Sequence, residues 1–463
     1  KPGGFGRREK RDFAEEAPRE SRLDRPEPPS RQPSIQSGLL TAGSLDDARN
    51  FEDYRQYLSE TLQNDPREQM PRFSLGRRIE ILVQNEQGRP VPNLIVSVRR
   101  SGADAKVLEV PVGTDGKAQL LTAWDSAEGT SKFDVTARTA DGGEITRTFN
   151  LNQTPWTITL QGAEASPPTR LDLSLVIDAT ASMGDELNYL KAEIDGIAAE
   201  VRERFPNVTQ RYSLICYRDE VDQYVTRTSD FTESLSEFRG DLAGQQARGG
   251  GDYTEAMHVA LETATQLDWR RGVAARVMFL VADAPPHQRH AGRTLAAIQK
   301  LRQQGVTVFP IAGSGSQDRA EFILRAAAFV TRGQYLFLTD HSGVGNPHAA
   351  PRAPRYQVER LDRLMIRMIA SELSGRKLLP KSVIATETQP STRPIATRQQ
   401  HVHAEPYAHP PQAEPYRSPP RSHSHHARHR WSFPKFPRWT VLVGALLCVC
   451  VIEFSSRKGW VRK

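Results

Sequence analysis

The chain has 463 residues, of which 38% are hydrophobic and 25% charged, so it is long and apolar enough for about two or three folded domains. Its formal net charge of +7 is modest for this length, and no folded-looking segment interleaves basic with aromatic residues, which argues against nucleic acid as a partner. Three cysteines are too few for a disulfide framework, and they leave the compartment open.

The first 66 residues divide into two parts. Residues 1–43 are polar, charged and rich in proline, and they contain few large aliphatic side chains. Because burial could not offset the entropy of ordering such a segment, we expect it to be disordered. Within 44–66, Phe51, Tyr54 and Leu58 recur at spacings of three and four. This period predicts a short amphipathic helix that docks on a neighbouring domain.

Residues 77–163 have the pattern of short strands joined by tight turns. Apolar residues alternate with other residues at Ile79, Ile81 and Val83, and further strands are predicted as far as Leu160. Turn sequences that contain Gly, Pro and Asp separate these strands. Short strands at regular spacing predict a small β-sandwich.

Two stretches of this region carry a resemblance. The run from Gln87 to Leu94 and the sequence Thr-Asp-Gly-Lys-Ala from Thr114 resemble the Ig-like, carboxypeptidase-regulatory-type sandwiches found in bacterial surface proteins. Gly and Asp tolerate the backbone angles of tight turns, so we expect a structural role for both stretches.

From 170 to 374 the pattern changes to buried strands that alternate with amphipathic helices. The first strand is predicted at Leu171–Ile177, and the last amphipathic helix at Val358–Leu373. This alternation predicts an α/β fold in which a doubly wound, mostly parallel sheet is covered by helices on both faces.

Oxygen-bearing side chains cluster where the predicted strands end. In such sheets, ligands bind at the carboxyl ends of the strands. Alternate residues of an extended loop point the same way, so several side chains of one loop can converge. The residues concerned, from three separate loops, are Asp178, Thr180, Ser182, Asp252, Thr254 and Asp283. Because Mg²⁺ prefers hard oxygen ligands, this pattern predicts a magnesium site.

The first of these loops carries a family resemblance. Asp178-Xaa-Thr180-Xaa-Ser182 resembles the Asp-Xaa-Ser-Xaa-Ser signature of von Willebrand factor type A (VWA) domains, and the likeness covers 170–374. It implies a metal-ion-dependent adhesion site (MIDAS) for Mg²⁺, or for Mn²⁺ or Ca²⁺. In such a site Thr180 and Ser182 bind the metal directly, and Asp178 and Asp283 bind it directly or through water. The resemblance also implies a non-catalytic protein-binding module whose partner presents an acidic side chain to the metal.

The middle loop departs from the family pattern. Family members commonly use Thr there, whereas Asp252 occupies the position that we favour and Thr254 follows as the alternative. Together with Asp178 and Asp283, an ionised Asp252 would hold a cation firmly but weaken its attraction for a carboxylate. A single Asp or Ser after a strand is often only a helix cap, but the convergence of three loops favours a metal site.

Enzymatic activity is not expected. No pair of nucleophile and base stands out, and Thr180 replaces the second acid of phosphotransferases that form an aspartyl-phosphate. The Gly313-Ser-Gly-Ser sequence lacks the lysine of a nucleotide-binding loop. His287 and His290 have no Cys or acidic residue at a recognised ligand spacing, so we expect solvated loop histidines.

The C-terminal part divides into a linker and an apolar run. Residues 375–437 are rich in Pro, His and Arg and are predicted to be a disordered linker, whose histidines from His401 onward could bind transition metals adventitiously. Residues 439–454 are almost wholly apolar and predict a short transmembrane anchor. Basic residues flank both ends, so the orientation stays open.

Two binding hypotheses follow. The first is an adhesion protein that the C-terminal segment anchors in a membrane and that is displayed outside the cytoplasm or at the cell surface. The second is an intracellular scaffold whose VWA domain organises a multiprotein complex. The appended Ig-like sandwich favours the first hypothesis, because an intracellular scaffold of this kind would more naturally neighbour an ATPase.

Overall fold

The computed structural model describes part of the chain. The described residues are 40–388, except for positions 66, 68, 93, 140–141, 343–350, 353–354 and 382. Within this part, none of the helices is both long and apolar enough to cross a membrane. The apolar run at 439–454 and the expected disorder of 1–39 and 389–437 lie outside the described residues.

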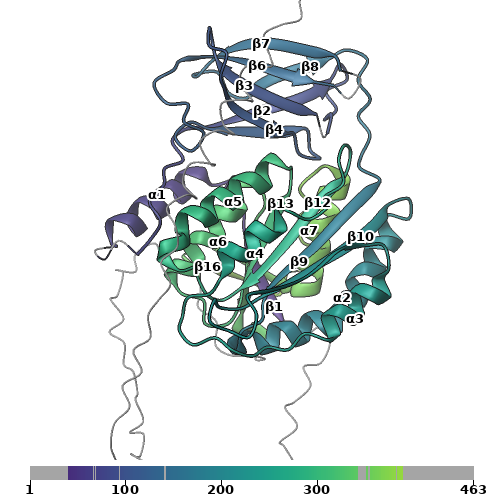
Figure 1. Cartoon of the computed structure of the whole chain (residues 1–463). Coiled ribbons are helices and arrows are strands. Elements are labelled where there is room, and N and C mark those ends of the chain that lie inside the picture. Colours follow the sequence, from purple (N-terminus) through teal and green to yellow (C-terminus); the bar gives the residue numbers. More distant parts are fainter. Residues whose placement is uncertain are drawn as a thin grey trace, which may run out of the picture. The chain divides into compact units, whose positions relative to one another are not determined.

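A mixed sheet forms the centre of the larger domain, with nine strands among the described residues (Figure 1). From one edge to the other the strands are β11 (Thr226–Thr232), β10 (Thr209–Tyr217), β9 (Arg170–Asp178), β12 (Ala275–Ala282), β13 (Thr307–Ala312), β14 (Tyr335–Thr339), β1 (Thr41–Leu45), β15 (Arg355–Arg360) and β16 (Ala385–Thr388). The strands from β10 to β14 pair in parallel, whereas the outer strands pair antiparallel. The α/β prediction is confirmed, but the sheet is parallel only at its centre.

Helices cover both faces of this sheet (Figure 1). One face packs against α2 (Gly184–Arg204), α3 (Leu235–Ala243) and α7 (Leu361–Ser374). The other face packs against α1 (Phe51–Gln63), α4 (Met257–Ala264), α5 (Ala291–Gln303) and α6 (Asp318–Val330). Every residue of β12 is buried, as expected for a strand that is covered on both faces.

The N-terminal segment joins this sheet. Strand β1 lies between β14 and β15, with Gly43 opposite both Phe337 and Val358. We expected disorder up to residue 43 and a helix from residue 44, but α1 begins only at Phe51. The pattern within one segment does not reveal a pairing partner that lies far along the chain. Residues 385–388, within the expected linker, likewise form a strand, β16.

Contacts with other elements explain where α1 docks and where α7 begins. The rings of Phe51 and Tyr54 in α1 contact the ring of Phe329 in α6, at centroid distances of 5.4 and 4.9 Å. Helix α1 therefore docks on the larger domain. The last helix, α7, begins at Leu361, three residues later than its periodicity indicates, because Val358 belongs to β15 and pairs with β1 and β16.

A second domain, residues 78–160, consists of two small sheets that share one core. The three-stranded sheet contains β5 (Lys117–Leu121), β2 (Arg78–Asn85) and β8 (Trp156–Leu160), and the four-stranded sheet contains β4 (Lys106–Pro111), β3 (Ile95–Arg100), β6 (Lys132–Arg138) and β7 (Glu144–Asn150). Trp156 is fully buried in this core, against Phe133 and Phe149. This arrangement agrees with the predicted β-sandwich.

The sandwich belongs to the same compact unit as the larger domain. Arg302 of α5 binds Asp125 at 2.7 Å, and Arg332, just after α6, binds Asp115 at 2.7 Å. Gln119 of the sandwich donates a hydrogen bond to the backbone oxygen of Phe329 at 2.8 Å. Charged and polar contacts therefore connect the two domains.

Candidate metal centre

The predicted motif lies where β9 ends. Asp178 is the last residue of this strand, and its side chain is fully buried. Thr180 has an extended backbone, with φ of −72° and ψ of 166°, and it leads into a short 3-10 helix at Ala181–Met183 and then into α2. The backbone nitrogen and the hydroxyl of Thr180 both donate to Oδ1 of Asp178, at 2.9 and 2.7 Å. This local turn holds the two side chains together.

Two further predicted ligands join this pair. The hydroxyl oxygens of Thr180 and Ser182 are 3.4 Å apart. Asp283, which follows β12, interacts with the Ser182 hydroxyl. Burial, and next the charge of Asp283, raise the pKa of Asp178 to about 7. The structure therefore brings together Asp178, Thr180, Ser182 and Asp283, from the ends of two adjacent parallel strands.

Glu255 is a carboxyl group in this centre that the sequence analysis did not identify. It is only 3% exposed, and its pKa is raised to about 9, first by burial and next by the charge of Asp178. The glycine loop explains how this side chain is enclosed. Gly250 has a φ of +77°, and a Cβ added to it would lie 3.1 Å from Oε1 of Glu255 and 3.2 Å from Cβ of Thr180. We call Asp178, Thr180, Ser182, Glu255 and Asp283 the carboxylate site.

The carboxylate site contains buried oxygens that lack hydrogen bonds. Oδ2 of Asp178, Oε2 of Glu255 and Oδ1 of Asp283 have no hydrogen-bond partner among the described residues. Unpaired buried carboxylate oxygens are costly, and a divalent cation is the kind of group that would satisfy them. Their hard oxygen chemistry, together with two hydroxyls, fits Mg²⁺.

Asp252 and Thr254 make different contacts. Oδ1 of Asp252 accepts hydrogen bonds from the backbone nitrogen and the hydroxyl of Thr254, both at 3.3 Å. The Thr254 hydroxyl is 2.8 Å from Nδ1 of His287, whose Nε2 is 2.6 Å from Oδ1 of Asp219. Asp219, Asp252 and His287 place one ligand atom each within 4.8 Å of one another. Which of Asp252 and Thr254 serves the carboxylate site stays a prediction.

The residues around the carboxylate site match a known protein family. Residues 172–344 match the family model of the von Willebrand factor A domain, and this range contains the strands and loops that carry the carboxylate site. This part of the chain is a VWA domain. The match begins within β9 and ends just after β14, and β1, β15, β16 and α7 lie outside the matched residues.

Two known proteins are similar to part of this chain. A protein of Acanthamoeba polyphaga mimivirus that is named as an ariadne-like RING finger protein is 28% identical over 186 residues, which cover 36% of this chain and 18% of that relative. The chain thus spans less than a fifth of that protein. The crystal structure of the conserved hypothetical protein BatB from Bacteroides thetaiotaomicron has a TM-score of 0.31 and 13% identity, covering 44% of this chain and 99% of BatB.

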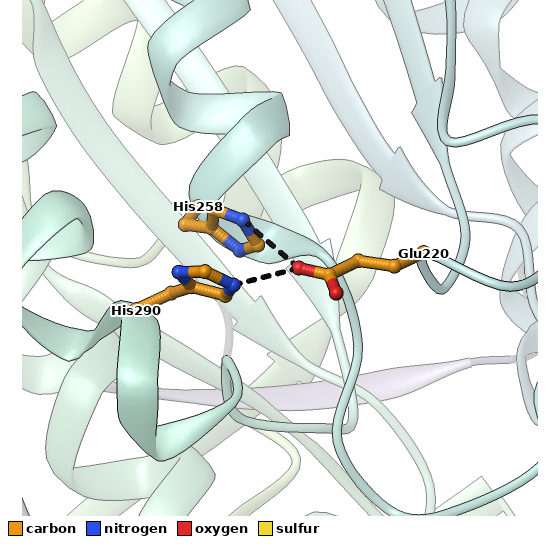
Figure 2. Close-up of side chains that lie close together, drawn as sticks. All are labelled: Glu220, His258 and His290. Atoms are coloured by element: carbon orange, nitrogen blue, oxygen red, sulfur yellow. Dashed lines mark ion pairs between the residues drawn. The ribbon is translucent and has the colours of Figure 1, made fainter. Parts of the chain in front are cut away.

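A second group of side chains lies within the matched residues of the VWA domain (Figure 2). Glu220 follows β10, His258 is in α4, and His290 ends the short 3-10 helix before α5. Nε2 of His258 is 3.4 Å, and Nε2 of His290 is 2.8 Å, from the same oxygen, Oε1 of Glu220. We call these three residues the histidine cluster. The expectation that His287 and His290 are solvated loop histidines was wrong. Their side chains are only 13% and 19% exposed, and they pair with Asp219 and Glu220.

Proposed function

We propose that the VWA domain is a non-catalytic module that binds a protein partner in a metal-dependent way. Asp178, Thr180, Ser182 and Asp283 would hold Mg²⁺, or Mn²⁺ or Ca²⁺ in its place, with Glu255 beside them. The observation that carries this proposal is the set of buried carboxylate oxygens without hydrogen-bond partners among the described residues, next to two hydroxyls. The match to a VWA domain model supports it.

The chain's own residues would prepare this site for its partner. The Thr180 hydroxyl donates a hydrogen bond to Oδ1 of Asp178, which directs the lone pairs of the Thr180 oxygen away from Asp178. A cation held there would supply the positive charge that attracts an Asp or Glu of the partner. Gly250 allows the loop to close over Thr180 and Glu255. No nucleic acid is expected to bind this site.

We also propose that the protein is membrane-associated and displayed outside the cytoplasm or at the cell surface. Two features support this proposal: the apolar run at 439–454 and the sandwich. We propose that the sandwich is related to Ig-like, carboxypeptidase-regulatory-type domains. An intracellular scaffold is the alternative. Protease added to intact cells would cleave the displayed protein, whereas complete protection would exclude display.

Titration of the full chain with Mn²⁺ tests the carboxylate site, because bound and free Mn²⁺ differ in their electron paramagnetic resonance signals. We expect Asp178→Ala to weaken Mn²⁺ binding by at least about tenfold, because it removes a buried carboxylate of the site. Excess Mg²⁺ should compete with Mn²⁺ in the unmodified protein.

The matched control is Asp195→Ala, since Asp195 is an exposed aspartate of α2 that pairs with Arg239. It should bind Mn²⁺ as the unmodified protein does. Circular dichroism checks that both variants are folded. If folded Asp178→Ala protein kept full Mn²⁺ affinity, the metal site proposed here would be wrong.

A further inference from the structure

The histidine cluster combines donor atoms that come from three separate elements. Its ligand atoms, one from each of Glu220, His258 and His290, all lie within 4.8 Å of one another. The two imidazole rings stack with a centroid distance of 4.0 Å and an interplanar angle of 22°. In Figure 2 both rings lie beside the Glu220 carboxylate, with a nitrogen of each directed at the same oxygen.

His258 is the residue that calls for an explanation. It is 1% exposed, and neither of its ring nitrogens forms a hydrogen bond with any described residue. Its contact with Glu220 at 3.4 Å is an ion pair only if the ring is protonated. Burial, and next the charge of His290, lower the pKa of His258 to about 4, so the ring is neutral at neutral pH. A neutral buried imidazole with two unpaired nitrogens is costly unless a ligand occupies one of them.

We propose that Glu220, His258 and His290 form a second metal site, which takes Zn²⁺ or a similar transition ion. Two imidazoles and one carboxylate are a ligand set found in zinc sites that keep a fourth position for water or a partner's atom. Imidazole nitrogen favours Zn²⁺, whereas Mg²⁺ favours sites made of oxygen. The histidine cluster and the carboxylate site should therefore select different metals.

The distances agree with this assignment. A tetrahedral zinc ion with bonds of about 2.0–2.1 Å holds its ligand atoms about 3.3 Å apart. The separations of 3.4 and 2.8 Å between the histidine nitrogens and Oε1 of Glu220 are close to that value. The two imidazole rings would have to turn out of their stacked arrangement, so that a nitrogen lone pair of each points at the same ion.

Arg289 is the residue that competes with a metal for this cluster. Its guanidinium pairs with Oε2 of Glu220, and its Nε is 3.1 Å from Nε2 of His290. The Arg289 side chain is 60% exposed, so it can move into solvent at little cost. We therefore expect Arg289→Ala to bind Zn²⁺ at least as tightly as the unmodified protein, because the competing charge is gone.

The position of the cluster indicates what the second metal would do. Glu220 adjoins Asp219, His258 follows the loop of Asp252, and His290 follows the loop of Asp283. A zinc ion would connect these three loops at the edge of the sheet where we propose that the partner binds. This consequence rests on the proposed function, but the zinc site itself does not.

Zinc binding by the full chain, first stripped of metal with a chelator, tests the proposal. Titration with Zn²⁺ against a chromophoric competitor gives the number and affinity of the sites, and Co²⁺ in place of Zn²⁺ gives the intense visible bands of tetrahedral coordination. We expect Glu220→Gln and His290→Ala each to lose one Zn²⁺ equivalent, or at least about tenfold in affinity, together with the tetrahedral Co²⁺ bands. Both side chains are partly exposed, so these variants should fold.

The controls separate this site from its neighbours. Histidines of the C-terminal segment contribute the same Zn²⁺ binding to every variant. The test is therefore the difference in bound Zn²⁺ between each variant and the unmodified protein. His287→Ala tests the neighbouring group of Asp219 and Asp252 and should retain the zinc equivalent, as should Asp178→Ala. Unchanged Zn²⁺ binding in Glu220→Gln and His290→Ala would overturn the proposal, as would a loss of zinc in Asp178→Ala alone. Mn²⁺ binding that persists in Glu220→Gln shows that the proposed function stands independently of this outcome.

Discussion

Single residues determine how closely the loops of the carboxylate site approach one another. Asp178 and Thr180 are held by a turn that both residues form themselves, whereas Glu255 is brought beside them by the glycine loop before α4. Gly250 and Gly251 are neighbours in that loop, but their surroundings differ. A Cβ at Gly250 would meet Thr180 and Glu255, whereas a Cβ at Gly251 would meet no atom within 4 Å.

Gly250→Ala should therefore weaken Mn²⁺ binding. The positive φ of Gly250 costs an alanine about 1–2 kcal/mol, and the new methyl group presses on Thr180. We expect a loss of several-fold in Mn²⁺ affinity and a lower free energy of unfolding, measured by titration and by urea denaturation. Gly251→Ala is the matched control and should leave both unchanged. Equal effects of the two substitutions would contradict this explanation of the loop.

Strand β1 occupies an inner position of the sheet that its own sequence does not indicate. It supplies five residues between β14 and β15 and so links the matched VWA region to the C-terminal strands. Gly43 lies at the centre of this pairing, where a Cβ would approach the ring of Phe337 to 2.4 Å and that of Tyr356 to 3.0 Å. Strand β1 can therefore lie against these two aromatic rings only because residue 43 has no side chain.

Gly43→Ala should destabilise the domain by about 1–3 kcal/mol, because the added methyl group overfills a packed site. Urea denaturation of the full chain measures this change. Gly196→Ala is a suitable control, since Gly196 is in α2 and a Cβ there would meet no atom within 4 Å. It should be neutral or stabilising by up to about 1 kcal/mol, because alanine favours helix. A stable Gly43→Ala protein would show that β1 contributes little.

For the whole molecule, the junction between the sandwich and the VWA domain is built from buried or partly buried charge. Glu372 of α7 accepts a hydrogen bond from Thr114 of the sandwich at 3.2 Å, close to the pair of Asp115 and Arg332. Burial, and next the charge of Asp115, raise the pKa of Glu372 to about 7, although Arg332 opposes this shift.

The stability of the molecule should therefore decrease as the pH rises. The folded state binds the Glu372 proton more tightly than the unfolded chain, so its contribution is complete below the unfolded pKa and is lost as the pH rises through about 7. Glu372→Gln keeps the hydrogen-bond acceptor but not the charge. Relative to the unmodified protein, it should gain on the order of 1 kcal/mol in unfolding free energy between about pH 5 and pH 8. Glu52→Gln, at an exposed position, should show no such gain. If the difference in unfolding free energy between Glu372→Gln and the unmodified protein did not change with pH, the raised pKa of Glu372 would be refuted.

Features that depend on local order along the chain could be predicted before the structure was known. The alternation of strands and helices predicted the α/β fold, and the spacing of Asp178, Thr180 and Ser182 predicted their convergence, because residues two apart in an extended loop share a side. Asp283 could be added because parallel strands end at one edge of a sheet.

Contacts between segments that lie far apart in the chain became visible only in the folded molecule. The pairing of β1 with β14 and β15, the burial of Glu255 beside Asp178, and the meeting of Glu220, His258 and His290 each join residues whose neighbours in sequence carry no sign of the partner. A period of two or of 3.6 residues reports which face of an element is buried, but it does not report which other element covers that face. For this reason the fold, the first metal loop and Asp283 were predictable, whereas Glu255 and the histidine cluster were not.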